Sequence, residues 1–152
     1  MPVAVTLYGS ILALHIAAVV VTFGGTFVNP LLFRLGAGEP RHRPVVWRAV
    51  HTIDRLVTRG MLVVLAAGIY LATDRHYWSE PWVGFSLGAL VVIGGVVGGV
   101  LVPSERKAIE LADRDPDSPE LAALERRQGQ VGAGLAVLVL VTIYVMTAKP
   151  FS

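Results

Sequence analysis

A histidine inside a long uncharged stretch is the first feature of this sequence that could do chemistry. His15 lies in a run from residue 2 to residue 33 that contains no Asp, Glu, Lys or Arg. Tyr8, His15, Thr22 and Asn29 are spaced seven residues apart, so a helix places them on one narrow stripe. Unsatisfied polar groups are costly in hydrocarbon, so this stripe is expected to face other helices. An imidazole there could bind haem or a metal, carry a proton, or bond to a hydroxyl or carbonyl group.

A second polar cluster follows in the next apolar segment. At about 100° per residue, one helical face carries its ionisable and hydroxyl side chains, which are His51, Asp54, Arg55, Thr58 and Arg59. One interpretation is an interfacial ion-pair network that anchors the helix, in which Asp54 pairs with Arg34 or with an arginine of its own helix. The other interpretation is a site for a ligand or a proton.

The positions of the two histidines argue against one cofactor held by both. Counting about 1.5 Å per residue, His15 lies roughly 18 Å below the outer end of its helix, whereas His51 lies about 33 Å below the outer end of the next. Simple bis-histidine ligation is therefore disfavoured. The same count brings Met61 to the level of His15, and its thioether is a weaker candidate. The candidate cofactor ligands are thus His15 and Met61.

Composition places the chain in a membrane. Hydrophobic residues make up 54% of the sequence and charged residues 16%, and the mean hydropathy is +0.64. A bilayer core about 30 Å thick needs on the order of 20 apolar residues per helix. Residues 3–32, 50–73, 82–102 and 131–148 meet this requirement approximately. We predict an all-α fold, in which residues 1–152 form a single integral membrane domain built as a four-transmembrane-helix bundle.

The distribution of basic residues predicts the orientation of this bundle. Every Lys and Arg except Arg75 and Lys149 lies in segments 34–59 and 106–127. The positive-inside rule therefore predicts a multi-pass protein of the cell membrane with loops 34–48 and 103–130 in the cytoplasm and both termini outside. Basic residues beside anionic lipids account for the positive charge, so the bilayer is the expected partner and nucleic acid is not.

The second of these cytoplasmic segments is predicted to be helical. Residues 103–130 mix charges of both signs at helical spacing, and the segment is interrupted at residues 115–119. Ser118 followed by Pro119 is typical of a helix start. We therefore expect a short cytoplasmic helical hairpin, over about residues 103–130, that extends the third and fourth helices.

Glycines on the third predicted helix indicate a packing surface. They form a stripe with overlapping GxxxG pairs, and they are Gly84, Gly88, Gly94, Gly95, Gly98 and Gly99. Such small residues let helix backbones approach closely. This face is therefore expected to contact another helix of the chain, another copy of the protein, or a subunit of a membrane complex.

The first helix also resembles known families. The pattern consists of Leu14-His15, Phe23-Gly24-Gly25, Asn29-Pro30 and Arg34. It resembles the first helix of small four-helix bacterial integral membrane proteins of uncharacterised function. More distantly, it is similar to the CopD-type copper-resistance proteins and the HemJ-type protoporphyrinogen oxidases. The resemblance implies a bundle in which His15 faces the interior and contacts haem or a metal. The oxidase version is weakened because Phe23 replaces the usual tryptophan and no lysine precedes Lys107 in the third helix.

Three functional hypotheses follow from these observations. The chain contains no cysteine, no phosphate-binding loop, no HExxH motif and no nucleophile motif. It could be a small redox protein that binds haem b or copper through His15. It could instead be an accessory or assembly subunit without a cofactor. The third hypothesis is a pathway for protons or small solutes along the polar stripe and Asp54. Whether the protein is an enzyme is left open.

Overall fold

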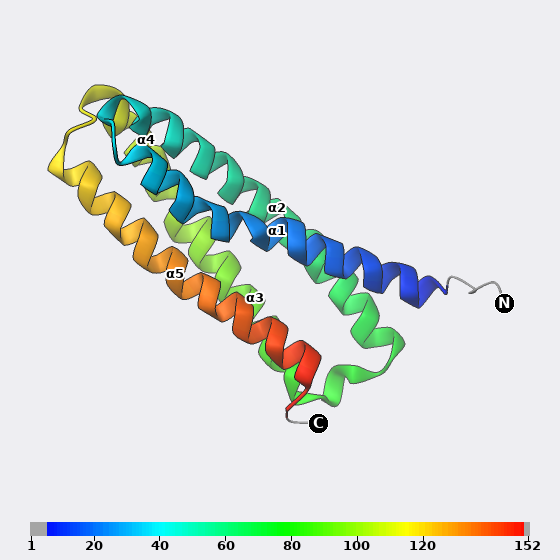
Figure 1. The fold of residues 1–152 in the computed structure, drawn as a ribbon. Coiled ribbons are helices and arrows are strands. Elements are labelled where there is room, and N and C mark those ends of the chain that lie inside the picture. The colour runs from blue at the N-terminus through cyan, green and yellow to red at the C-terminus, as the bar shows by residue number, and fades with distance from the viewer. Residues whose placement is uncertain (1–5, 151–152) are drawn as a thin grey trace.

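The computed structural model describes residues 6–150, and its long helices lie side by side in one bundle (Figure 1). The helices are α1 (Leu7–Gly36), α2 (Arg43–Asp74), α3 (Pro81–Val96), α4 (Val102–Arg114) and α5 (Pro119–Ala148). Short 3-10 turns occupy Pro40–His42 and Tyr77–Ser79. The described residues contain no strand, so the predicted all-α fold is confirmed.

The bundle consists of four continuous helical rods, namely α1, α2, α3 together with α4, and α5, because α3 and α4 are joined without a break. A π-helical turn, Val97–Leu101, connects these two helices. Within residues 6–150, four segments are therefore long and apolar enough to cross a membrane, namely Leu7–Gly36, Pro40–Asp74, Pro81–Arg114 and Pro119–Ala148. The chain is thus a multi-pass four-helix bundle. The α4 helix and the start of α5 extend the last two rods as a hairpin, with Ser118 as the N-cap of α5.

The helices are longer than the predicted ones. The first helix continues to Gly36 instead of residue 32, and the second begins at Arg43 instead of residue 50. Most of the predicted loop 34–48 is therefore helical. Hydropathy falls where charged residues begin, but a helix continues past that point when its charged groups are solvated. The predicted start of the first helix at residue 3 lies outside the described residues.

Glycines bring α1 and α2 closest together. A Cβ atom added at Gly60 would overlap the side chain of Thr22, and one added at Gly25 would overlap Ile53. At Gly36 it would lie 2.8 Å from Cγ2 of Val46. Close approach therefore depends on glycines of the first two helices, which the GxxxG pattern of the third helix did not indicate.

The predicted glycine stripe of α3 faces mostly away from the rest of the chain. Gly84, Gly88, Gly95 and Gly99 are exposed, and nothing lies within 4 Å of a Cβ atom added at any of them. Gly94 is different, because its added Cβ would lie 3.1 Å from Cε of Met61, and Gly98 lies near Thr58. Within the described chain only Gly94 and Gly98 of the stripe lie near another helix, and contact of the stripe with a second copy or another subunit stays a prediction.

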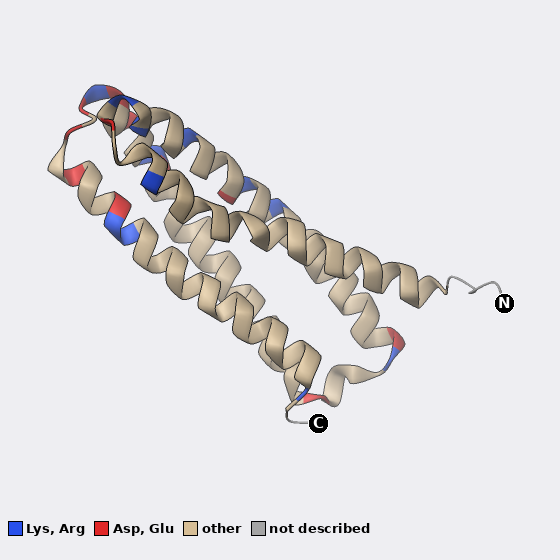
Figure 2. Ribbon diagram, viewed as in Figure 1, with Lys and Arg blue, Asp and Glu red and all other residues tan. Residues whose placement is uncertain are grey.

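Two apolar clusters fill the interior. The larger one, called here the central core, consists of Phe23, Val57, Met61, Ile93, Val97, Leu101, Leu135 and Val139. The smaller one, near the α4–α5 turn, is built around Trp47, Ala108, Ala112 and Leu121. The ring of Phe33 packs edge-on against Trp47, with ring centroids 5.0 Å apart. Lys and Arg residues gather at this end of the bundle, called here the basic end (Figure 2).

The contact between α1 and α2 gives a first test. We expect Gly60→Ala to lower the free energy of unfolding by about 1–3 kcal/mol, because the added methyl group overpacks against Thr22. Gly95→Ala is the matched control, since the space around its added Cβ is open. Unfolding would be measured in detergent micelles. Equal stability of the two variants would contradict the close α1–α2 contact.

Candidate functional site

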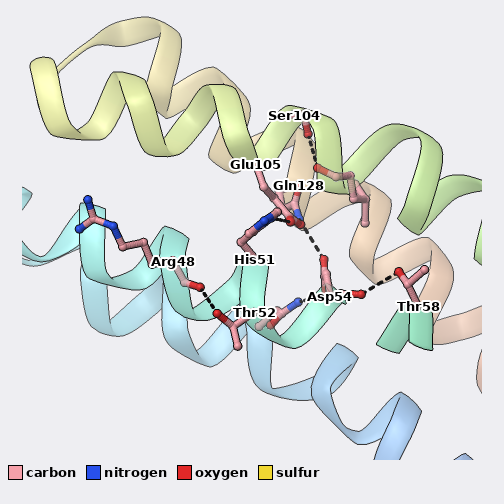
Figure 3. Close-up of polar contacts among 10 residues, drawn as sticks. Arg48, His51, Thr52, Asp54, Thr58, Ser104, Glu105 and Gln128 are labelled. Carbon is pink, nitrogen blue, oxygen red and sulfur yellow. Dashed lines mark hydrogen bonds and ion pairs between the residues drawn. The ribbon is translucent and has the colours of Figure 1, made fainter. Parts of the chain in front are cut away.

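Two polar sites lie at different levels of the bundle. One is an open cavity in the half of the bundle where α1 begins and α5 ends, called here the terminal half (Figure 1). The other is a buried network of carboxyl and amide groups nearer the basic end (Figure 3). His15 belongs to the first site and His51 to the second. This separation agrees with the different levels expected for the two histidines.

The terminal-half cavity is large enough for a small ligand. Its volume is about 330 Å³, at the lower end of the range of roughly 300–1,000 Å³ typical of ligand sites. All four rods contribute to its walls, which are mostly apolar and include Leu12, Val19, Leu65 and Leu90. The polar residues that line it include Tyr8, His15, Ser86, Thr142 and Lys149.

His15 is held in a defined tautomer by the neighbouring helix. Its side chain is 8% exposed, and its Nδ1 lies 3.1 Å from the carbonyl oxygen of Val64. A carbonyl only accepts hydrogen bonds, so Nδ1 donates and Nε2 of the neutral ring is the acceptor. Gly68 gives the ring room, because an added Cβ there would lie 3.3 Å from Cε1 of His15. Within the described chain Nε2 has no hydrogen-bond partner, so it can accept a bond or bind a metal.

The hydroxyl groups of Ser86 and Thr142 on the cavity wall are also oriented by their own helices. The Ser86 hydroxyl donates to the carbonyl oxygen of Trp82 at 2.8 Å, and the Thr142 hydroxyl donates to that of Leu138 at 2.7 Å. Because both protons are used within the helix, only oxygen lone pairs remain for a ligand. These two residues, like His15, offer acceptors to anything that enters.

Aromatic rings and two basic residues surround this end of the bundle. Tyr77 and Trp82 pack edge to face, with centroids 5.3 Å apart, and Lys149 Nζ lies 5.0 Å from the Tyr77 ring and 5.1 Å from the Trp82 ring. Arg75 lies over the ring of Tyr8 at 4.2 Å. Such amphipathic groups are typical of the lipid headgroup level in membrane proteins.

The methionine on the cavity wall differs from the predicted candidate. Met61 belongs to the central core, packs against Gly94 and does not line the cavity with His15. Met146 of α5 does line it. Counting levels from the helix ends missed Met146 because His15 lies beside Val64 and Gly68, nearer the end of α2 than Met61, so the level assigned to His15 was wrong. Among residues 6–150, no group of three or more His, Asp or Glu residues is placed to hold a metal ion.

All four rods contribute to the second site, called here the carboxyl network. Gln128 Nε2 of α5 donates to Glu105 Oε1 of α4 at 2.7 Å and approaches Asp54 Oδ2 of α2 at 3.4 Å. Asn29 Nδ2 of α1 donates to Asp54 Oδ1 at 2.9 Å, and His51 Nδ1 lies 2.9 Å from Glu105 Oε2. Glu105 is fully buried, and Asp54 and Gln128 are 4% and 5% exposed.

The structure brings only part of the predicted polar cluster together. Asn29, His51 and Asp54 meet in the carboxyl network, and Asp54 forms no ion pair with Arg34 or another described basic residue. Other members of the predicted cluster lie elsewhere. Thr22 is buried against Gly60, Tyr8 lines the cavity, and Arg55 and Arg59 are exposed on α2. The Thr58 hydroxyl donates to the backbone carbonyl oxygen of Asp54 at 2.9 Å (Figure 3).

Glu105 and Gln128 are the network members that the sequence interpretation missed. Both lie in the segment assigned to the cytoplasmic hairpin, where charged and amide residues were expected to be solvated. One signal was present, because Leu101, Glu105, Ala108 and Ala112 recur at spacings of three or four residues and are all buried. This spacing places Glu105 on the apolar face of its helix.

No protein-family model, curated protein or solved structure matches this chain. The resemblance of the first helix to the CopD-type and HemJ-type families therefore stays a prediction. It depends on the residues around His15.

The Gln128 amide gives a second test. We expect Gln128→Leu to destabilise the protein by about 1–3 kcal/mol, because Glu105 and Asp54 lose the donor they share while remaining buried. Gln130→Leu is the matched control on the same helix, since Gln130 is exposed. Denaturant or thermal unfolding in micelles would measure both variants. A Gln128→Leu variant as stable as the control would show that the network does not hold α4 and α5 together.

Proposed function

We propose that the protein binds a flat, apolar small molecule in the terminal-half cavity, with His15 as its principal polar contact. The observation that carries this proposal is the Nε2 of His15, which has no partner within the described chain and lies on the wall of a mostly apolar cavity. Proteins commonly hold small ligands in such cavities, where a few polar groups fix the orientation of the bound molecule.

Haem b is the occupant that the family resemblance suggests, and the residues of the cavity are compatible with it. A histidine that ligates iron usually donates its other ring nitrogen to a carbonyl or carboxylate group, as His15 donates Nδ1 to Val64. The thioether of Met146 is available on the same cavity wall from a different helix. His and Met together are a known axial pair for haem iron.

The roles of the chain in this proposal are binding, orientation and exclusion of water. Bound haem would supply one-electron redox chemistry. His15 would fix its position from α1, Met146 could approach from α5, and the apolar walls would keep water away. The cavity is not fully enclosed, so a ring larger than its volume can extend beyond it. Copper has less support, because in the described chain His15 belongs to no group of three or more His, Asp or Glu residues that could hold a metal ion.

Visible absorption tests this function directly. Protein purified in mild detergent from haem-replete cells is expected to show a stoichiometric Soret band that is lost in His15→Ala. Met146→Leu should shift the spectrum of the reduced form or the midpoint potential. Met61→Leu is the matched control, because Met61 lies in the central core and outside the cavity wall.

Two results would contradict haem binding at this site. One is a wild-type protein that contains no haem and takes none up when haem is added. The other is a Soret band that is unchanged in His15→Ala. In either case the cavity would have to bind a different apolar molecule.

The proposal also includes an orientation, with the basic end in the cytoplasm and the terminal half outside. It follows from the excess of basic residues near one end, which favours the cytoplasmic side. A ligand would then reach His15 from the outer half of the bilayer.

Cysteine labelling tests this orientation, and the absence of native cysteine makes it simple. Ser79→Cys lies in the turn before α3 and Asp117→Cys in the turn before α5, and both native residues are exposed. A membrane-impermeant maleimide should label Ser79→Cys in intact cells and Asp117→Cys only after permeabilisation. The reverse pattern would invert the topology.

A further inference from the structure

The carboxyl network contains more negative than positive charge. Asp54 and Glu105 are its acids, and His51 is its only group with a positive form. Asn29 from α1 and Gln128 from α5 are neutral. Even with His51 protonated, one carboxylate lacks a counter-charge.

Nearby basic residues do not supply this counter-charge by contact. Arg55 of α2 and Arg106 of α4 are exposed, and within the described chain neither forms an ion pair with Asp54 or Glu105. An isolated charge in a buried, membrane-spanning region is expensive, so proteins pair or neutralise it. The network therefore requires one further positive charge.

A small cavity adjoins the network at Asp54. Its volume is about 30 Å³, whereas a cavity needs roughly 10–15 Å³ to hold one water-sized particle. Thr26 and Asn29 of α1, Asp54 of α2 and Gln128 of α5 are the polar side chains that line it. Oxygen-bearing residues from three helices therefore reach a space of suitable size, whose other walls are apolar.

The unsatisfied groups at this cavity are acceptors. Asn29 uses its nitrogen to donate to Asp54, and its Oδ1 is buried without a hydrogen-bond partner in the described structure. Pro30 lies inside α1 and has no N–H, so the carbonyl group of Thr26, four residues earlier, lacks its usual helical donor. Acceptors combined with excess negative charge favour a positively charged occupant.

We infer that this site binds one small monovalent cation, either a sodium ion in the cavity between Asp54 and Asn29 or a proton on the Asp54 carboxylate. Known membrane cation sites use the same components, namely a carboxylate together with oxygen atoms from an interrupted helix. A sodium ion would use the oxygens of Asp54, Asn29 and Thr26 as ligands. A proton would neutralise the Asp54 carboxylate, with water bonded to Asn29 Oδ1.

This cation site is separate from the proposed haem cavity. The central core lies between them, since Phe23, Ile93 and Val139 line the larger cavity while Val97, Leu101 and Leu135 line the smaller one. Loss of haem binding would therefore leave the cation site in place, and the reverse also holds.

Thermal unfolding of the purified full chain in detergent tests the inference. Sodium chloride would be compared with choline chloride at equal ionic strength, across a series of pH values. If sodium is the ligand, the wild-type midpoint should rise with sodium concentration and then saturate. If a proton is the ligand, the midpoint temperature of unfolding should not depend on sodium concentration and should rise as the pH falls.

The variant Asp54→Asn separates cation binding at Asp54 from a general effect of salt or pH on stability. This variant removes the charge that the cation neutralises, so it should lose the response to sodium or pH that the wild type shows. Asp117→Asn is the matched control, because Asp117 is exposed in the turn before α5 and should leave the response unchanged.

A direct measurement of cation binding to the wild type keeps the inference testable if the Asp54→Asn variant does not fold. Binding of radioactive sodium to the wild type should saturate at one ion per chain for a sodium site. For a proton site, infrared difference spectra should show one carboxyl group protonating as the pH falls. A wild type that responds to neither ion, or an Asp54→Asn variant that responds as the wild type does, would overturn the inference.

Discussion

Polar groups within the hydrocarbon core of a membrane have no water to bond, so they must find partners inside the protein. This constraint determines where the rods of the bundle meet. The Gln128 amide lies between Glu105 and Asp54, and Asn29 reaches Asp54 from the first helix, so α1, α2, α4 and α5 all contact one network. In the other half, His15 meets the same requirement by donating to the Val64 carbonyl group. Helix contacts and polar sites are therefore two results of the same requirement.

The arrangement divides the interior into two compartments with different chemistry. The terminal half offers an apolar space in which His15, Ser86 and Thr142 present acceptors. The half toward the basic end offers almost no space, but it contains two buried acids. Because the central core lies between them, a molecule could occupy one compartment without disturbing the other.

The sequence predicts the parts of this structure that depend on one helix at a time. Length and hydropathy identify the four rods, and the uncharged surroundings of His15 predict that it faces the interior. Partners on other helices depend on how each helix is rotated about its axis, which spacing along one segment does not fix. This is why the glycines that matter most for contact proved to be Gly25 and Gly60. Glu105 and Gln128 were missed because their segment was expected to be solvated, and Met146 because helix levels were counted from the helix ends.

The π-helical turn at Val97–Leu101 has a consequence for how this chain can change during evolution. Buried residues recur every four positions from Ile93 through Val97 and Leu101 to Glu105, whereas a regular α-helix repeats every 3.6 residues. The wider turn absorbs this difference and keeps Glu105 on the inner side. Loss of one residue from the turn would rotate α4 by about 100° and turn Glu105 away from Gln128. Descendants of this sequence should therefore vary more freely in the side chains of this turn than in its length.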